Sequence, residues 1–256
     1  MKKVRLGNHT LEIYDSIEEL PMIRFHKYNK MLLVDAGIGS DLSDVDRHID
    51  KAIRYSRSKT PELAAVELDN MRQNIYFIQS NLNPKHLAFA ALVKSIDGKA
   101  CLDLSEDGLR KIVQSLEHAT IKEVMTEFDS VKKKIDEELQ MYFPQTFDDA
   151  ELKEYFDKLK RRTMLMLDSI INGETDKNKS DIEKLTDELM IYSKPYIFSG
   201  ADNMEINYDK QFERMCLNIS QNLNVNPKNF TVLEYYNSYE YIKELIKERK
   251  KSIKAK

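Results

Sequence analysis

Glycine and proline are scarce in this sequence. Seven glycines and six prolines occur among 256 residues, less than half of the roughly 12% that the two contribute to ordinary proteins. Few turn residues mean few turns, so we expect long helices. Sandwiches, barrels and propellers need many turns and are strongly disfavoured. The remaining composition, 32% charged and 41% hydrophobic, is typical of a globular protein.

Cysteines and long apolar runs are also few. Cys101 and Cys216 are the two cysteines, and we expect both to be reduced, half-buried core residues rather than a disulfide. Residues 1–5 are basic, but no apolar segment follows them, so the sequence predicts no secretory signal. No window approaches 18 consecutive apolar residues, which argues against a transmembrane helix.

Neither sign of charge dominates, since 40 basic residues face 43 acidic ones. This balance disfavours a dedicated nucleic-acid-binding protein. The basic residues gather at the C-terminus, where the segment 243–256 holds seven of them and two acidic residues. Such a basic tail is either a solvated helix end or a segment that docks on an acidic partner or a phosphate backbone.

The hydrophobic pattern predicts a mainly α fold, a multi-helix, bundle-like body with a small N-terminal β-hairpin. Val4, Leu6, Leu11 and Ile13 alternate with polar residues around a glycine-containing turn, as in a hairpin. A short irregular or strand-like piece is expected at 101–102. Start signals and helical spacing predict helices over about 16–34, 41–57, 61–81, 84–93, 106–118, 120–142, 148–171, 180–193, 207–223 and 231–252.

Three of these helices have a defined expected face. The segment 87–93 is nearly all apolar, so we expect it at the centre of the core. Apolar residues also define the faces of two earlier helices. The helix over 41–57 should bury Leu42, Val45, Ile49, Ala52 and Ile53, and the helix over 61–81 is carried by Leu63, Val66, Leu68, Met71, Ile75 and Ile78.

The polar stretch 172–180 contains a glycine and has no periodicity, which is typical of a linker. It predicts a division of the chain into three parts. A helical body with the N-terminal hairpin spans 1–171, the polar linker spans 172–180, and a C-terminal helical segment with the basic tail spans 181–256.

A Gly-x-Gly segment, Gly37–Ile38–Gly39, follows the apolar run 32–34 and invites comparison with a phosphate-binding loop. A third glycine and a following lysine are missing, and Asp35, Asp41, Asp44 and Asp46 surround the turn. Those carboxylates would repel a phosphate. We interpret the segment as a helix C-terminus followed by a helix N-cap, with acidic residues in the first turn.

No constellation of catalytic or metal-binding residues stands out. The spacing of Asp41, Asp44 and Asp46 does not fit a calcium loop. The histidines lie singly, without a neighbouring cysteine, which argues against zinc: His9, His26, His48, His86 and His118. We interpret each as a surface or packing residue. A nucleophile–base pair distant in sequence stays possible without a supporting motif. The sequence therefore predicts no catalytic, cofactor-binding or metal-binding residue.

Short basic runs and a group of tyrosines have two interpretations each. The runs 132–134 and 161–162 are expected on solvated helix faces with acidic i,i+4 partners, rather than on a phosphate track. Tyr235, Tyr236, Tyr239 and Tyr241 crowd the last helix. They are either core residues whose hydroxyls reach water or part of a subunit contact, for which tyrosine and methionine are favoured.

Several segments resemble structural proteins of tailed phages that infect gut Bacteroidales, the crAss-like group. The resemblance is carried by 14–21 (YDSIEELP), 25–41 (FHKYNKMLLVDAGIGSD), 95–99 (SIDGK) with 104–109 (LSEDGL), and 230–236 (FTVLEYY), about a third of the chain. It implies a mostly helical, non-enzymatic virion part in the neck or tail, without cofactor or metal.

The implied function is a ring or head–tail connector subunit that acts through protein–protein contacts around the DNA channel. Its expected partners are further copies in a ring, the portal and tail components, and DNA that passes without sequence-specific binding; no membrane is involved. The implied location is the virion, assembled in the cytoplasm of the bacterial host. In a ring, each subunit meets its neighbours through two different surfaces. The alternative is a soluble tail-assembly chaperone that is not retained in the particle.

Overall fold

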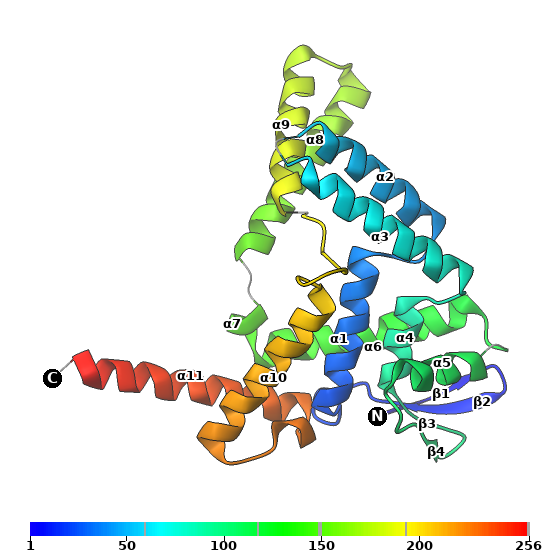
Figure 1. Cartoon of the computed structure of the whole chain (residues 1–256), viewed down its shortest axis with the longest axis vertical. Helices are drawn as coiled ribbons and strands as arrows, with labels where there is room; N and C mark the ends of the chain where they lie inside the picture. The colour runs from blue at the N-terminus through cyan, green and yellow to red at the C-terminus, as the bar shows by residue number, and fades with distance from the viewer. Residues whose placement is uncertain (59, 117, 148–149, 193, 255–256) are drawn as a thin grey trace. The chain divides into compact units, whose positions relative to one another are not determined.

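The fold is mainly helical with a small N-terminal β-hairpin, as the sequence predicts. A computed structural model (Figure 1) describes residues 1–58, 60–116, 118–147, 150–192 and 194–254. The chain forms two compact units. Unit 1 consists of Met1–Tyr142 and Ile197–Lys256, and unit 2 is the inserted segment Phe143–Tyr196.

Unit 1 holds most of the helices, and most predicted helices are found within a few residues of their expected bounds. Its helices are α1 (Met22–Gly37), α2 (Leu42–Ser56), α3 (Glu62–Gln79), α4 (Pro84–Leu92), α5 (Glu106–Ser115), α6 (Ile121–Tyr142), α10 (Met204–Leu223), the 3₁₀ helix η1 (Pro227–Asn229) and α11 (Val232–Lys254). Unit 2 holds α7 (Pro144–Phe147), α8 (Ala150–Asn172) and α9 (Asp176–Tyr192). The start expected at 148–149 lies outside the described residues.

The N-terminal hairpin belongs to a four-stranded antiparallel sheet in the order β1-β2-β3-β4. Its strands are β1 (Lys2–Leu6), β2 (His9–Ile13), β3 (Val93–Ile96) and β4 (Lys99–Ala100). Asp97 and Gly98, with φ of +49° and +77°, form the two-residue turn between β3 and β4. The helix expected over 84–93 instead ends at Leu92, and the strand-like piece expected at 101–102 lies at Lys99–Ala100. A four-residue strand is too short for its periodicity to be read, so its pairing with β2 is a tertiary effect.

The core of unit 1 lies where α1, α4 and α6 meet. The ring of Phe128 on α6 lies 6.1 Å from that of Tyr28 on α1 and 6.3 Å from that of Phe89 on α4. All residues from Leu87 to Val93 are buried, so the expectation for this segment is confirmed. Helix α6 contributes a buried stripe at helical spacing, which consists of Val124, Phe128, Val131, Ile135 and Leu139.

The C-terminal helices are tied to the N-terminal part of unit 1. Backbone hydrogen bonds run from Met22 N to Phe230 O (2.8 Å) and from Val232 N to Leu20 O (2.9 Å). Beyond these bonds, α11 extends away from the rest of unit 1 (Figure 1). This grouping differs from the division expected at 172–180. That segment lies within unit 2, and its second half belongs to α9.

Helices α2 and α3 bury other faces than expected. In α2, Ala52 is buried as predicted, but Leu42, Ile49 and Ile53 are exposed. The buried residues of α3 are all polar, namely Glu67, Asn70 and Asn74, while Leu68 is exposed. The apolar-face prediction was therefore wrong for Leu42, Ile49 and Ile53 of α2 and for Leu68 of α3. The other apolar residues named for α3 are half-buried, namely Leu63, Val66, Met71, Ile75 and Ile78. The most buried positions of α3 are polar because hydrogen-bonded polar side chains, such as Glu67 beside His48, can take the place of apolar ones in the interior.

Candidate interaction surface

The Gly-x-Gly segment is a helix junction, which confirms the interpretation from the sequence. Helix α1 ends at Gly37, and Asp41 is the N-cap of α2, where it accepts a hydrogen bond from Asp44 N (3.1 Å). The Asp44 carboxylate accepts in return from Ser40 N (2.8 Å) and Asp41 N (3.2 Å). The backbone N–H groups that would bind a phosphate are therefore already occupied by a carboxylate of the chain itself.

A buried network of polar side chains from α2 and α3 holds the backbone of this junction in place. The Ile38 carbonyl oxygen lies 2.8 Å from His48 Nε2 and accepts a hydrogen bond from Asn74 Nδ2 (3.1 Å). His48 Nδ1 lies 2.6 Å from Glu67 Oε2, and both side chains are only 1% exposed. Because both ring nitrogens of His48 face oxygen atoms, its imidazole is held on one side by Glu67 and on the other by the Ile38 carbonyl.

Sequence reasoning missed this network. It treated His48 as an isolated packing or surface residue and did not assign an interior role to the polar positions of α3. The available signal was the spacing of Glu67, Asn70 and Asn74, which places three polar residues on one helical face. Such a face is usually solvated, so only the packing of α2 against α3 reveals its burial.

The tyrosines of α11 differ in how far they are buried. Tyr235 is buried, and its ring packs against Phe212 and Tyr236 at 6.1 and 5.7 Å. Burial raises the pKa of Tyr236 to about 12. Tyr241 is exposed. Core packing therefore accounts for the first two, while Tyr239 is half-buried beside the Lys243 ammonium, 4.2 Å from its ring.

His26 joins α1 to α10. Its ring lies parallel to those of Tyr208 and Phe212, with centroids 4.6 and 4.1 Å away, and its Nε2 lies 2.9 Å from Asp209 Oδ1. Burial lowers the pKa of His26 below the ordinary 6.5, although Asp209 acts in the opposite direction. His26 is thus a packing residue, which agrees with its interpretation from the sequence.

Arg24 is a second buried polar residue that sequence reasoning missed. Its guanidinium donates to Ala91 O (3.0 Å), to Val93 O (2.9 Å) and to Cys101 O. These bonds fasten α1 to the junction between α4 and β3. Burial lowers the pKa of Arg24 below its ordinary value. Because its guanidinium N–H groups donate to backbone carbonyls at the helix–strand junction, we interpret Arg24 as a residue that stabilises the fold.

The cysteines and two lysines of the run 132–134 have the surroundings that the sequence predicts. Cys101 is half-buried, Cys216 is buried, and both are free thiols. Lys132 and Lys133 pair with Asp136 and Glu137 one helical turn later. Lys134 instead lies 2.7 Å from Asp15, a distant residue. For the basic tail, side chains from 249 onward are not described, and 255–256 lie outside the described residues.

Neither a metal site nor a membrane span is found in the described part of the chain. No group of three or more histidine, cysteine, aspartate or glutamate side chains there is placed to hold a metal ion. None of the helices within the described ranges combines the length and the apolar character that crossing a bilayer requires.

Unit 2 is built around the antiparallel pair α8 and α9. Lys158 on α8 lies 3.4 Å from Glu188 on α9 and 3.0 Å from Glu154. Near the connection, Asn178 Nδ2 donates to Asp168 Oδ2 (2.8 Å). The residues of α8 that are half-buried recur at helical spacing along one side, at 155, 158, 159, 162, 165 and 169.

The other side of α8 carries an exposed apolar stripe, which we call the α8 stripe: Phe156, Met164, Leu167 and Ile171. Spacings of eight, three and four residues place these side chains on one side of the helix. Ile171 is 77% exposed. Lys160 lies within the same stripe and is exposed as well. A helix that is apolar on two sides buries both when it is fully packed.

A matching surface lies on α2, in unit 1. The α2 stripe consists of Leu42, Ile49 and Ile53, spaced by seven and four residues, with Leu42 73% exposed. Asp46 lies within this stripe and is exposed. Each stripe is therefore apolar except for one charged residue. The charges of these two residues, Lys160 and Asp46, are opposite in sign, so the stripes are complementary in charge.

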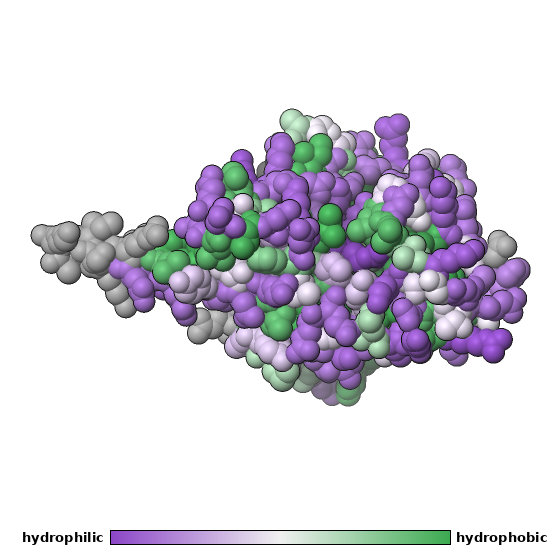
Figure 2. All heavy atoms as spheres, turned by 90° about the horizontal axis from the view of Figure 1, so that it is seen from below, coloured by the Kyte–Doolittle hydropathy of each residue, from purple (hydrophilic) through white to green (hydrophobic). Residues whose placement is uncertain are grey.

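Elsewhere the surface is mixed. On the face that Figure 2 shows, hydrophobic residues form several separate groups between hydrophilic ones. That face does not by itself single out a docking surface. The two stripes differ from these groups in that each follows one side of a single helix, interrupted by one charged residue, which is the arrangement found where a helix packs against another chain.

Comparisons of this chain with protein-family models, with curated proteins and with solved structures give no match. The α8 and α2 stripes are therefore identified as a candidate interaction surface by their exposure, spacing and charge alone.

Proposed function

We propose that the protein is a non-enzymatic structural subunit of a phage virion, a ring or head–tail connector subunit that acts through protein–protein contacts around the DNA channel. It would be assembled in the bacterial cytoplasm and located in the virion, next to portal and tail components. The proposal rests on the resemblance of segments 14–21, 25–41, 95–99, 104–109 and 230–236 to proteins of the crAss-like phages. One structural observation supports it.

That observation is the pair of exposed stripes on α8 and α2. We assign their occupant as a second copy of the same chain, with the α8 stripe of one copy on the α2 stripe of the next. Two different surfaces that meet head to tail generate a ring when the rotation closes. Burying exposed apolar side chains supplies the stability, about 25 cal/mol for each Å², and Lys160 opposite Asp46 favours this register.

The oligomeric state of the purified chain tests the proposal. Light scattering coupled to size-exclusion chromatography, run over a range of concentrations, should give a closed oligomer. The double variant Leu167→Asp/Ile171→Asp should be a monomer, because two carboxylates cannot be buried without partners. A wild-type chain that stays monomeric at every concentration would reject the ring.

A matched control separates the stripe from a general effect of charge. Lys179→Asp/Lys184→Asp changes two exposed residues of α9 and adds two carboxylates to unit 2. Because it also removes two ammonium groups, its change in net charge is twice that of the α8 double variant, so it tests the effect of charge more severely. This variant should assemble like the wild type. If it dissociates equally, then the charge of unit 2 rather than the α8 stripe controls assembly.

Mass spectrometry of purified particles tests the location. A ring component should be present at a fixed ratio to the major capsid protein, on the order of a dozen copies, as expected for a cyclic assembly. Absence from particles together with abundance in the lysate would instead favour the tail-assembly chaperone. Removal of the basic segment 243–256 should lower particle yield, because this segment is expected to dock on a neighbouring protein.

A further inference from the structure

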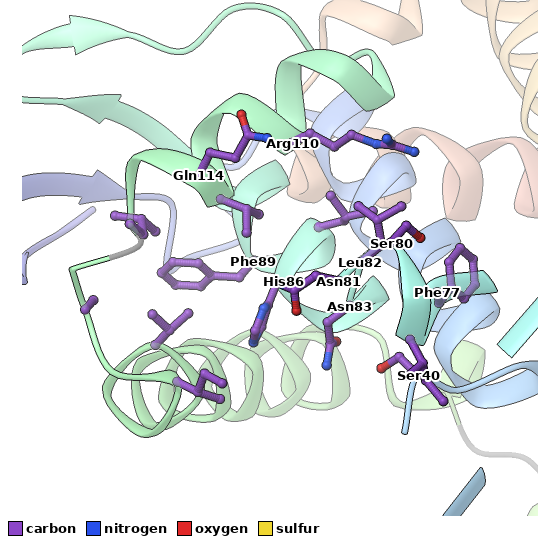
Figure 3. Close-up of a pocket in the computed structure, with 17 residues that line it drawn as sticks. Ser40, Phe77, Ser80, Asn81, Leu82, Asn83, His86, Phe89, Arg110 and Gln114 are labelled. Atoms are coloured by element: carbon purple, nitrogen blue, oxygen red, sulfur yellow. The ribbon is translucent and has the colours of Figure 1, made fainter. Parts of the chain in front are cut away.

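Unit 1 contains a cavity of about 730 Å³ that none of the foregoing contacts uses (Figure 3). It lies between the end of α3, the α3–α4 loop, α4, α5 and the start of α6. Sites for small molecules in proteins are typically 300–1,000 Å³ in volume. The cavity therefore has the size of a binding site for a small molecule.

Most of its wall is apolar. Phe77 comes from α3, Phe89 from α4, Leu116 from the end of α5 and Val124 from α6. A wall made of aromatic and aliphatic side chains with a few polar groups is the usual lining of small-molecule sites. The body of a ligand here should accordingly be apolar.

Two buried polar atoms in this wall lack a hydrogen-bond partner among the described residues, His86 Nε2 and Arg110 Nε. Figure 3 shows the His86 ring pointing from α4 into the space flanked by Phe89 and Asn83. Two other polar atoms nearby are occupied: the Ser80 hydroxyl donates to the Tyr76 carbonyl, and Asn83 Oδ1 accepts from Lys85 N (2.8 Å). Buried polar atoms without a partner are rare, so His86 Nε2 marks a position where a ligand atom can bond.

The charges around the cavity favour an uncharged ligand group. Burial lowers the pKa of His86 from 6.5, so the imidazole is neutral at pH 7 and its Nε2 can exchange one hydrogen bond. The Arg110 guanidinium is already paired with the Glu106 carboxylate one turn earlier. A ligand carboxylate would therefore lack an unpaired cation at this position.

We propose that this cavity binds a small, largely apolar molecule that carries one hydroxyl or carbonyl group, with that group bonded to His86 Nε2. Phenol and toluene are suitable probes, because they have nearly the same size and differ by a hydroxyl in place of a methyl group. Their binding is measured on the full chain by calorimetry, and the histidine side-chain nitrogens are followed by ¹⁵N NMR.

Phenol should bind about three- to tenfold more tightly than toluene, the gain expected from one hydrogen bond. It should also shift the resonance of His86 Nε2, and that of no other histidine. The variant His86→Phe keeps an aromatic ring without the nitrogen, so it should bind the two probes equally. Equal affinities in the wild-type chain, or no binding of either probe, would overturn the proposal.

A second pair of variants locates the site without relying on His86. Val113→Trp, within the cavity wall, should fill the space and abolish phenol binding. Lys111→Trp places the same ring on the exposed side of α5 and should leave binding unchanged. Circular dichroism verifies that both variants fold. Phenol binding that survives Val113→Trp would place the ligand elsewhere and contradict the inference.

Discussion

Helices α4 and α8 are both rich in apolar residues, but the molecule uses them differently. Every residue of α4 from Leu87 to Leu92 is buried, because α4 packs against α1, α5 and α6. Helix α8 packs on α9 and exposes its second apolar side, from Phe156 to Ile171. The comparison teaches that an apolar face indicates where water is unfavourable, but not whether the same chain provides the cover.

The largest expected effect separates the two helices directly. Phe89→Ala in α4 should lower the free energy of unfolding by about 3–5 kcal/mol, because it leaves a cavity in the core. Leu167→Ala in α8 should change it by less than about 0.5 kcal/mol, as for an exposed residue. Urea unfolding at low protein concentration measures both. Equal losses would mean that α8 is a core helix and would remove the contrast.

The second prediction concerns the buried polar face of α3, which is as enclosed as α4 but held by hydrogen bonds. Glu67→Ala should destabilise the chain by about 3 kcal/mol, since His48 Nδ1 loses its partner inside the protein. Glu62→Ala, at an exposed position of the same helix, serves as the control in thermal unfolding. If both variants unfold alike, the His48–Glu67 pair does not hold the junction of α1 and α2.

The third prediction uses the pH dependence of the α1–α10 contact. The pKa of His26 is lowered in the folded chain, so the unfolded chain binds more protons as the pH falls below 6.5. Stability from this group is complete above pH 6.5 and is lost as the pH falls through 6.5 toward the folded-state pKa. His26→Phe should flatten the loss in denaturant midpoints between pH 7 and 5, leaving the contribution of His86.

The smallest effect sharpens the assignment of the α8 stripe. Lys160→Glu should weaken assembly by about two- to fivefold in the dissociation constant, the usual magnitude for an exposed ion pair. Asp46→Lys should do the same, and the double variant Lys160→Glu/Asp46→Lys should restore the affinity. The effect should shrink in high salt. Two single effects that simply add in the double variant would show that these residues do not meet.

Local signals in the sequence predicted the helices well. The N-cap and proline at Asn83–Pro84 and the capping pair Asp41 and Asp44 are formed by neighbouring residues, so they need no tertiary structure. The interpretation of the Gly-x-Gly segment as a helix junction was correct for the same reason. The acidic residue that disfavoured a phosphate there, Asp44, is the one that occupies the backbone N–H groups.

The buried faces were harder to predict, because burial depends on partners far away in the sequence. The hydrophobic pattern of α2 pointed to Leu42, Ile49 and Ile53, yet the interior side is the one that places His48 against Glu67. A buried ion pair or hydrogen bond needs two residues in register, here 19 positions apart, and neither residue alone indicates it. The unpartnered nitrogen of His86 was hidden in the same way.

The sequence by itself determined the helical class, most helix bounds, the N-terminal hairpin and the buried α4, because these depend on spacing and on neighbours within a few residues. Tertiary structure decided the rest. It joined the C-terminal helices to α1 in one unit, although the sequence of unit 2 separates them in the chain. It also turned polar residues of α3 inward and left the α8 and α2 stripes exposed. These outcomes depend on the free energy of contacts between segments distant in the chain, which no local pattern contains.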